Sequence, residues 1–94
     1  MIRINAFIRL KDAADAEQVK QIAQELVAQS RKDEGNIAYD LFHSATDPQN
    51  MMFCETWENI EALKAHEKQP HFTTIVPQIS KYTDGQMKLE KFEF

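Results

Sequence analysis

Residues 36–57 have the sequence NIAYDLFHSATDPQNMMFCETW, two stretches of strand-forming residues on either side of a turn. The first runs from Asn36 to about Ser44 and the second from Met51 to about Trp57. Between them, Asp47-Pro48-Gln49-Asn50 consists of residue types that favour turns. This segment therefore predicts a β-hairpin.

Apolar side chains occupy consecutive positions in both strands, so they fall on both faces of the hairpin. They are Ile37, Ala38, Tyr39, Leu41 and Phe42 in the first strand, and Met52, Phe53, Cys54 and Trp57 in the second. An antiparallel sheet with one face in water shows a cleaner apolar-polar alternation. We therefore expect helices to cover one face and another surface to cover the other.

A strand and a helix are predicted before the hairpin. In Ile2–Leu10, the apolar even-numbered positions share one face and the odd-numbered positions, Asn5 among them, share the other. Asp15 to about Lys32 carries an apolar stripe at helical spacing, with Asp15 as the expected N-cap in a capping box. Gly35 is expected to end this segment, because glycine tolerates the left-handed conformation.

Two helical pieces and a strand are predicted after the hairpin. Asn59 is expected to cap a short helix that ends at about Glu67. Pro70 suits the first position of a further helix, and Pro77 is expected to kink or split that helix. Gln86–Phe94 is predicted to be the last strand.

The order β-α-β-β-α-β predicts an α+β fold of the ferredoxin-like type, an antiparallel sheet with helices on one face. The 94 residues suit a single domain, residues 1–94. A chain of this length buries only about 60–65% of its unfolded surface when it folds alone. Since the second sheet face also needs a cover, we expect a homodimer.

Composition argues against several classes of protein. The net charge is −4 and no cluster of Lys and Arg is present, so a nucleic-acid partner is not expected. No apolar run approaches the roughly 18 residues of a membrane span. The N-terminus has no signal-peptide pattern and Cys54 has no partner for a disulfide, which together predict a cytoplasmic protein.

The sequence contains no strong catalytic or cofactor motif, and its histidines are His43, His66 and His71. His66 and His71 are five residues apart, with Pro70 between them, and this spacing does not place two ligands on one helical face. No metal ion is therefore expected.

Five polar or aromatic residues have both a structural and a functional interpretation. Trp57 is either core packing or the wall of a pocket, and Glu55, on the same strand face, is either a structural partner or a pocket carboxylate. His66 is near the edge of an apolar stripe and His71 follows the proline at a helix start, where an imidazole is kept neutral. Asn5 is either a pocket amide or exposed to solvent.

Four segments together resemble the antibiotic biosynthesis monooxygenase family. EGNIAYDL at residues 34–41 resembles that family's strand entry, and FCETW at 53–57 resembles its E-x-W/Y strand end. EALKAH at 61–66 followed by PHF at 70–72 resembles its A-x-x-x-H and P-H-F/Y/M segments. The resemblance covers nearly the whole chain, and the group of quinol monooxygenases and autoinducer-2-phosphate isomerases is the most similar.

This resemblance implies a dimeric α/β barrel with a pocket between the sheet and the helices of each subunit. It also implies oxygenase chemistry without flavin or metal, so no cofactor is expected. In the haem-degrading branch of the family an Asn, a Trp and a His surround the ligand, and Asn5, Trp57 and His66 are the matching candidates here.

The resemblance implies first a cofactor-independent monooxygenase that acts on a quinol or dihydroxy-aromatic substrate. A neutral His66 or His71 would remove a phenolic proton, and the resulting anion would pass an electron to O₂. Tyr39 and Trp57 would stack against the ring in a dry cavity.

Two other functions remain open at this point. One is an isomerase of a small, phosphorylated hydroxyketone, in which the same histidines move protons and Arg3 and Arg9 are candidates to hold the phosphate. The other is a dimer that binds a small ligand without catalysis.

Overall fold

Four antiparallel strands form one sheet in the order β2-β3-β1-β4 in the computed structural model, which describes residues 1–94. The elements are β1 (Ile2–Arg9), a 3₁₀ turn (Ala13–Asp15), α1 (Ala16–Ser30), β2 (Asn36–His43), β3 (Asn50–Trp57), α2 (Ile60–His66), α3 (Pro70–Ser80) and β4 (Lys88–Glu93). This is the ferredoxin-like α+β fold, so the predicted class and order of elements are confirmed.

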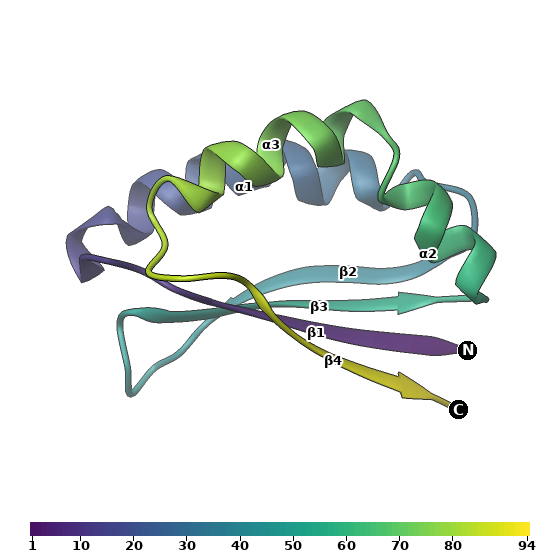
Figure 1. Ribbon diagram of the computed structural model, residues 1–94, viewed down its shortest axis with the longest axis horizontal. Helices are drawn as coiled ribbons and strands as arrows, with labels where there is room; N and C mark the ends of the chain where they lie inside the picture. Colours follow the sequence, from purple (N-terminus) through teal and green to yellow (C-terminus); the bar gives the residue numbers. More distant parts are fainter.

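All three helices lie on the same side of the sheet (Figure 1). α1 and α3 run next to each other along the sheet, and α2 covers the end of the sheet where both chain termini lie. None of these helices has both the length and the apolar character needed to cross a membrane.

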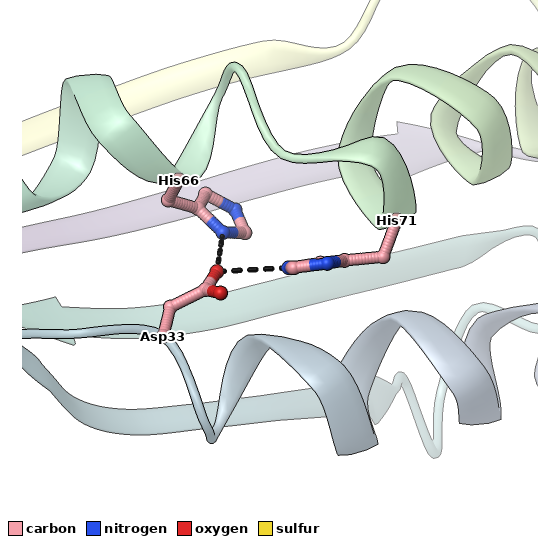
Figure 2. Close-up of side chains that lie close together, drawn as sticks. All are labelled: Asp33, His66 and His71. Carbon is pink, nitrogen blue, oxygen red and sulfur yellow. Dashed lines mark hydrogen bonds and ion pairs between the residues drawn. The ribbon is translucent and has the colours of Figure 1, made fainter.

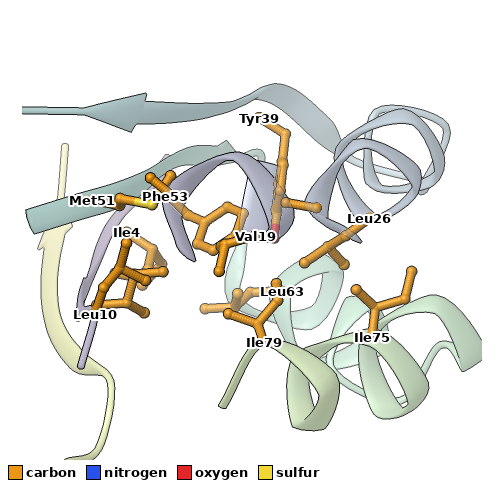
Figure 3. Close-up of a cluster of buried hydrophobic side chains, with 14 of the residues drawn as sticks. Ile4, Leu10, Val19, Leu26, Tyr39, Met51, Phe53, Leu63, Ile75 and Ile79 are labelled. Carbon is orange, nitrogen blue, oxygen red and sulfur yellow. The ribbon is translucent and has the colours of Figure 1, made fainter. Parts of the chain in front are cut away.

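The core lies between this helical layer and the sheet (Figure 3). In β1 the alternation is as predicted, because the side chains of Ile2, Ile4, Ala6 and Ile8 are buried under the helices. Fully burying an aliphatic or aromatic side chain stabilises a fold by about 1.5–3 kcal/mol. The largest such side chains here include Trp57, Phe53, Leu10, Leu26 and Ile79.

The start of α1 differs from the prediction. Asp12, not Asp15, is the capping residue: its backbone is extended (φ −138°, ψ 126°) and its carboxylate accepts a hydrogen bond from the Ala14 amide at 2.9 Å. Asp15 already has helical dihedrals (φ −83°, ψ −3°) and makes no side-chain cap. A capping side chain needs the extended backbone that Asp12 has, because only then does it reach the free N–H groups of the first turn.

Pro77 does not split its helix, so of the two expected outcomes, a kink or a split, the split is wrong. α3 is one helix from Pro70 to Ser80 with Pro77 inside it. Proline removes the hydrogen bond that its own N–H would donate to the preceding turn. Ile75 and Ile79, on either side of Pro77, are both buried in the core, and this burial offsets the loss of one hydrogen bond.

Gly35 is in the turn between α1 and β2, where the backbone of the turn approaches α2 closely. Its φ is +80°, its carbonyl accepts a 2.8 Å hydrogen bond from the Glu58 amide, and an added Cβ would lie 2.5 Å from the Cβ of Ala62 in α2. α1 itself ends earlier than predicted, at Ser30, so Gly35 belongs to the following turn. The left-handed conformation expected for this glycine is confirmed.

We expect Gly35→Ala to lower the free energy of unfolding by more than about 2 kcal/mol, because the new methyl group adds a collision with Ala62 to the strain of a positive φ. Gly85→Ala is the matched control. Gly85 has nearly the same φ, +82°, but nothing lies within 4 Å of its added Cβ, so only the strain of about 1–2 kcal/mol applies. Urea unfolding of both variants measures the difference, and equal losses would show that the close approach to α2 is unimportant.

Candidate active site

A single carboxylate oxygen joins three segments that are distant in the sequence (Figure 2). Oδ2 of Asp33 lies 2.7 Å from Nδ1 of His66 and 2.8 Å from Nε2 of His71. Asp33 is in the turn that follows α1, His66 is the last residue of α2, and His71 is the second residue of α3. The two helix ends therefore bring both imidazoles to one acceptor.

The three side chains are withdrawn from water. The exposed fraction is 1% for His66, 8% for Asp33 and 13% for His71. Burial lowers the pKa of His66, while the hydrogen bond and the charge of Asp33 act in the opposite direction. A carboxylate only accepts hydrogen bonds, so Nδ1 carries the proton of the neutral ring. Nε2 of His66 is then an unprotonated nitrogen, and it is buried without a hydrogen-bond partner.

Two imidazoles and a carboxylate are also donor groups that transition metals bind, and their donor atoms here lie within 4.8 Å of one another. Both nitrogens, however, are at hydrogen-bond distance from the same oxygen, and two N–H donors to one carboxylate account for the arrangement. The spacing of His66 and His71 along the sequence indicates only that they do not share one helical face, whereas in the fold the turn after α1 brings Asp33 to both of them. The absence of a metal stays a prediction.

A pair of polar side chains, Glu55 and Trp57, lies beside this group of three. The indole Nε1 of Trp57 donates a 3.0 Å hydrogen bond to Oε1 of Glu55, and both residues are buried. Burial raises the pKa of Glu55 to about 7, with the hydrogen bond from Trp57 opposing the change and the charge of Glu67 adding to it. Glu55 is consequently a group that both gives and takes protons near neutral pH.

The pair and the group of three are in contact through the rings of Trp57 and His66. The rings of Trp57 and His66 have centroids 4.5 Å apart with 37° between their planes. Tyr39 packs on the same cluster, with its ring 5.5 Å from that of His66 and 6.4 Å from that of Trp57. Burial raises the pKa of the Tyr39 hydroxyl further from neutrality, so it stays protonated.

A cavity of about 290 Å³ lies between the sheet and helices α2 and α3, and both Glu55 and His66 line it. A cavity of about 150 Å³ holds a benzene molecule, so this one accommodates a substituted ring. Most of the lining is apolar: Ile4, Ala6, Ile60, Leu63, Phe72, Met87 and Leu89. Lys64, Glu67 and Lys91 complete it.

The structure brings five of the six predicted site residues together. Glu55 and His66 face the cavity, while Tyr39, Trp57 and His71 pack around His66 and are not part of the lining. Trp57 is 0% exposed, and its ring packs against that of His66.

Asn5 is the exception. Its register partner is Cys54, on the sheet face that points away from the helices, and its amide donates to Glu90 at 3.3 Å. The expectation that Asn5 joins Trp57 and His66 around one ligand is therefore wrong for this cavity. The physical reason is the alternation of side chains along β1: Ile4 and Ala6, on either side of Asn5, are the residues that line the cavity.

The two candidate phosphate ligands are also elsewhere. Arg3 donates to Thr56 Oγ1 at 2.8 Å on the open sheet face, and Arg9 pairs with Asp47 at 3.0 Å near the hairpin turn. The cations that line the cavity are instead Lys64 and Lys91. Asp33, the residue that joins the two histidines, was not singled out in the sequence.

Fold and site together define a small ferredoxin-like α+β protein with a buried acid-base cluster beside a mostly apolar cavity. The family model for antibiotic biosynthesis monooxygenase matches residues 1–78. The chain belongs to the antibiotic biosynthesis monooxygenase family.

Known relatives agree with this assignment. The curated protein "Putative monooxygenase YcnE" of Bacillus subtilis (strain 168) is 36% identical over 76 residues, which are 81% of this chain and 79% of that protein. A Bacteroides thetaiotaomicron VPI-5482 structure, described as a conserved protein of unknown function and possible oxidoreductase, is 48% identical with a TM-score of 0.89. The matched region covers 99% of this chain and 96% of the Bacteroides chain. A crystal structure of an antibiotic biosynthesis monooxygenase is 29% identical with a TM-score of 0.92. The matched region covers 100% of this chain and 98% of that protein's chain.

The raised pKa of Glu55 predicts a pH dependence of stability. The folded state holds this proton more tightly than the unfolded chain, in which the pKa is near 4.5. The resulting stabilisation is fully present below pH 4.5 and is lost as the pH rises through about 7. A difference of this size between the two states corresponds to roughly 3 kcal/mol at most.

Glu55→Gln keeps an acceptor for Trp57 but cannot ionise, so this part of the pH dependence should disappear. Urea unfolding of both proteins between pH 5 and pH 8 isolates the effect, because His66 and the other titrating groups are common to both. We expect the wild-type protein to lose stability relative to the variant as the pH rises. Parallel curves would mean that Glu55 ionises normally.

Proposed function

We propose that this protein is a cofactor-independent monooxygenase for a small hydroxylated aromatic substrate, such as a quinol or another dihydroxy-arene. The observation that carries the proposal is the position of His66. Its unprotonated Nε2 has no partner, and its side chain lines a cavity of a size and polarity that suit a substituted ring.

The first step of the proposed reaction is removal of a phenolic proton by Nε2 of His66. The phenolate is electron-rich, so it passes an electron to O₂ directly, and the two radicals combine to form a peroxide at a ring carbon that carries hydrogen. Breaking the O–O bond leaves one oxygen on the ring as a carbonyl and releases the other as water. That water takes the former ring hydrogen and the former hydroxyl hydrogen, so one C–H and one O–H become two C=O groups and O₂ is fully reduced.

Glu55 has the properties of the partner acid in this sequence. It lines the same cavity as His66, and its pKa of about 7 leaves a large fraction protonated at neutral pH. A protonated carboxyl group next to the leaving hydroxide would supply the proton that makes it water, and the ring C–H proton would then restore this carboxyl group to its protonated form. Apolar side chains of both the sheet and the helices would limit the number of water molecules around the phenolate and the peroxide.

His66→Asn tests the proposal. The Asn amide nitrogen takes the place of Nδ1 and can still donate to Asp33, but the basic Nε2 is removed. We expect the rate of O₂ consumption with a panel of quinols to fall about 10²–10⁴-fold, the usual effect of losing a general base. Full activity in this variant would show that the base is elsewhere.

His43→Asn is the matched control, because His43 is at the hairpin, where its Nε2 contacts the Pro48 carbonyl at 2.8 Å, far from the cavity lining. It should consume O₂ at the wild-type rate. If the wild-type protein consumed no O₂ with any substrate of the panel, the monooxygenase assignment would fail.

We also propose that two copies associate through the open face of the sheet. Phe7, Met52 and Phe42 form one row across β1, β3 and β2 on this face, and Phe42 is 53% exposed. Phe92 of β4, paired with Arg3 on the same face, is 51% exposed. Apolar groups gathered in this way on a small domain mark a surface for association.

Light scattering at micromolar concentration should report twice the chain mass of 10.9 kDa. Phe42→Lys places a charge within the proposed contact and should shift the mass towards one chain, with an unchanged circular dichroism spectrum. A wild-type mass of one chain would contradict the dimer.

A further inference from the structure

We infer that Asp33 is a positioning residue of this site, which holds the proton of His66 on Nδ1 and leaves Nε2, the nitrogen proposed as the base, free of a proton. The inference rests on the proposed function for its kinetic consequence. The underlying arrangement of protons does not depend on the substrate.

The two hydrogen bonds at Asp33 assign a proton to one nitrogen of each ring. Oδ2 accepts one hydrogen bond from Nδ1 of His66 at 2.7 Å and another from Nε2 of His71 at 2.8 Å. Both distances are within the range of charge-assisted hydrogen bonds. Since a carboxylate only accepts, His66 is the Nδ1–H tautomer and His71 is the Nε2–H tautomer. In isolated histidine these two tautomers interconvert freely, so the carboxylate selects between them.

This assignment distinguishes the two histidines. His66 has a second nitrogen, Nε2, that is free of any hydrogen-bond partner, and His66 is the histidine that lines the cavity. His71 uses its Nε2 to bind Asp33 and is absent from the cavity lining. The base is therefore His66, and His71 acts as a second donor that holds the carboxylate in place.

Packing alone would not fix the orientation of the His66 ring. The ring packs against Trp57, with centroids 4.5 Å apart, and against Phe72, with centroids 5.2 Å apart. These contacts restrain the ring, but a half-turn about its last torsion exchanges Nδ1 with a carbon and keeps nearly the same shape. Only the hydrogen bond to Asp33 distinguishes the two orientations.

Asp33 would also stabilise the state that follows proton transfer. When Nε2 accepts the substrate proton, the ring becomes an imidazolium beside the carboxylate, which compensates its charge in a buried setting. Serine proteases use a carboxylate in this way, and its replacement by an amide there lowers turnover about 10⁴-fold.

The first test observes the tautomers without any substrate. Two-bond ¹H–¹⁵N correlation spectra of the wild-type protein should show a protonated Nδ1 on His66 and a protonated Nε2 on His71. In Asp33→Asn the His66 signals should move towards a mixture of tautomers. Asp40→Asn is the matched control: it removes a carboxylate that pairs with Arg31 at 2.8 Å on an exposed part of β2, and it should leave both signals unchanged.

The second test measures kinetics with a substrate found in the O₂ panel. Asp33→Asn should lower kcat about 10²–10⁴-fold with KM changed by only a few-fold. His71→Gln keeps an amide donor at the position of Nε2, so it should stay within about ten-fold of the wild-type rate, whereas His66→Asn should not.

Three results would overturn the inference: a protonated Nε2 on His66 in the wild-type protein, loss of turnover in His71→Gln equal to that in His66→Asn, or a stoichiometric metal ion bound by the three side chains. If no substrate were turned over, the proposed function would fail while the spectra still decided the role of Asp33.

Discussion

The structure of the site depends on the need of one buried carboxylate, Asp33, for hydrogen-bond donors. A carboxylate withdrawn from water is costly unless donors surround it, and here the donors are the imidazoles at the end of α2 and the start of α3. The same turn approaches α2 at Gly35, where only a hydrogen atom fits against Ala62. These contacts fix both helices relative to α1, and the cavity is the space that remains beneath α2 and α3.

Three of the buried ionisable groups, Glu55, Tyr39 and His66, favour their uncharged forms because burial shifts their pKa values. Glu55 has no cationic partner, so burial raises its pKa to about 7, and Tyr39 next to it stays protonated. Burial keeps His66 neutral against the pull of Asp33. The site therefore holds an uncharged base and a half-protonated acid at neutral pH, a combination that suits proton transfer to and from an uncharged ring.

Local patterns were sufficient to predict the fold and most of the residues near the site. Alternation in β1 correctly placed Asn5 on the face opposite Ile4, whereas the family resemblance wrongly grouped it with His66. Asp12 and Asp15 are both acceptable caps by residue type, and only the backbone dihedrals distinguish them. Asp33 could not be found from a pattern, because its role arises from contacts 33 and 38 residues away along the chain.

Trp57 shows why core packing and function are not alternatives in this protein. It is fully buried and outside the cavity lining, as expected of a core residue. Its indole N–H nevertheless binds Glu55, and its ring packs on His66. The hydrogen bond holds down the pKa of the proposed acid, and the ring contact helps to exclude water from the proposed base. A domain this small has few side chains to spare, so the residue that completes its core also lowers the pKa of Glu55 and packs against the ring of His66.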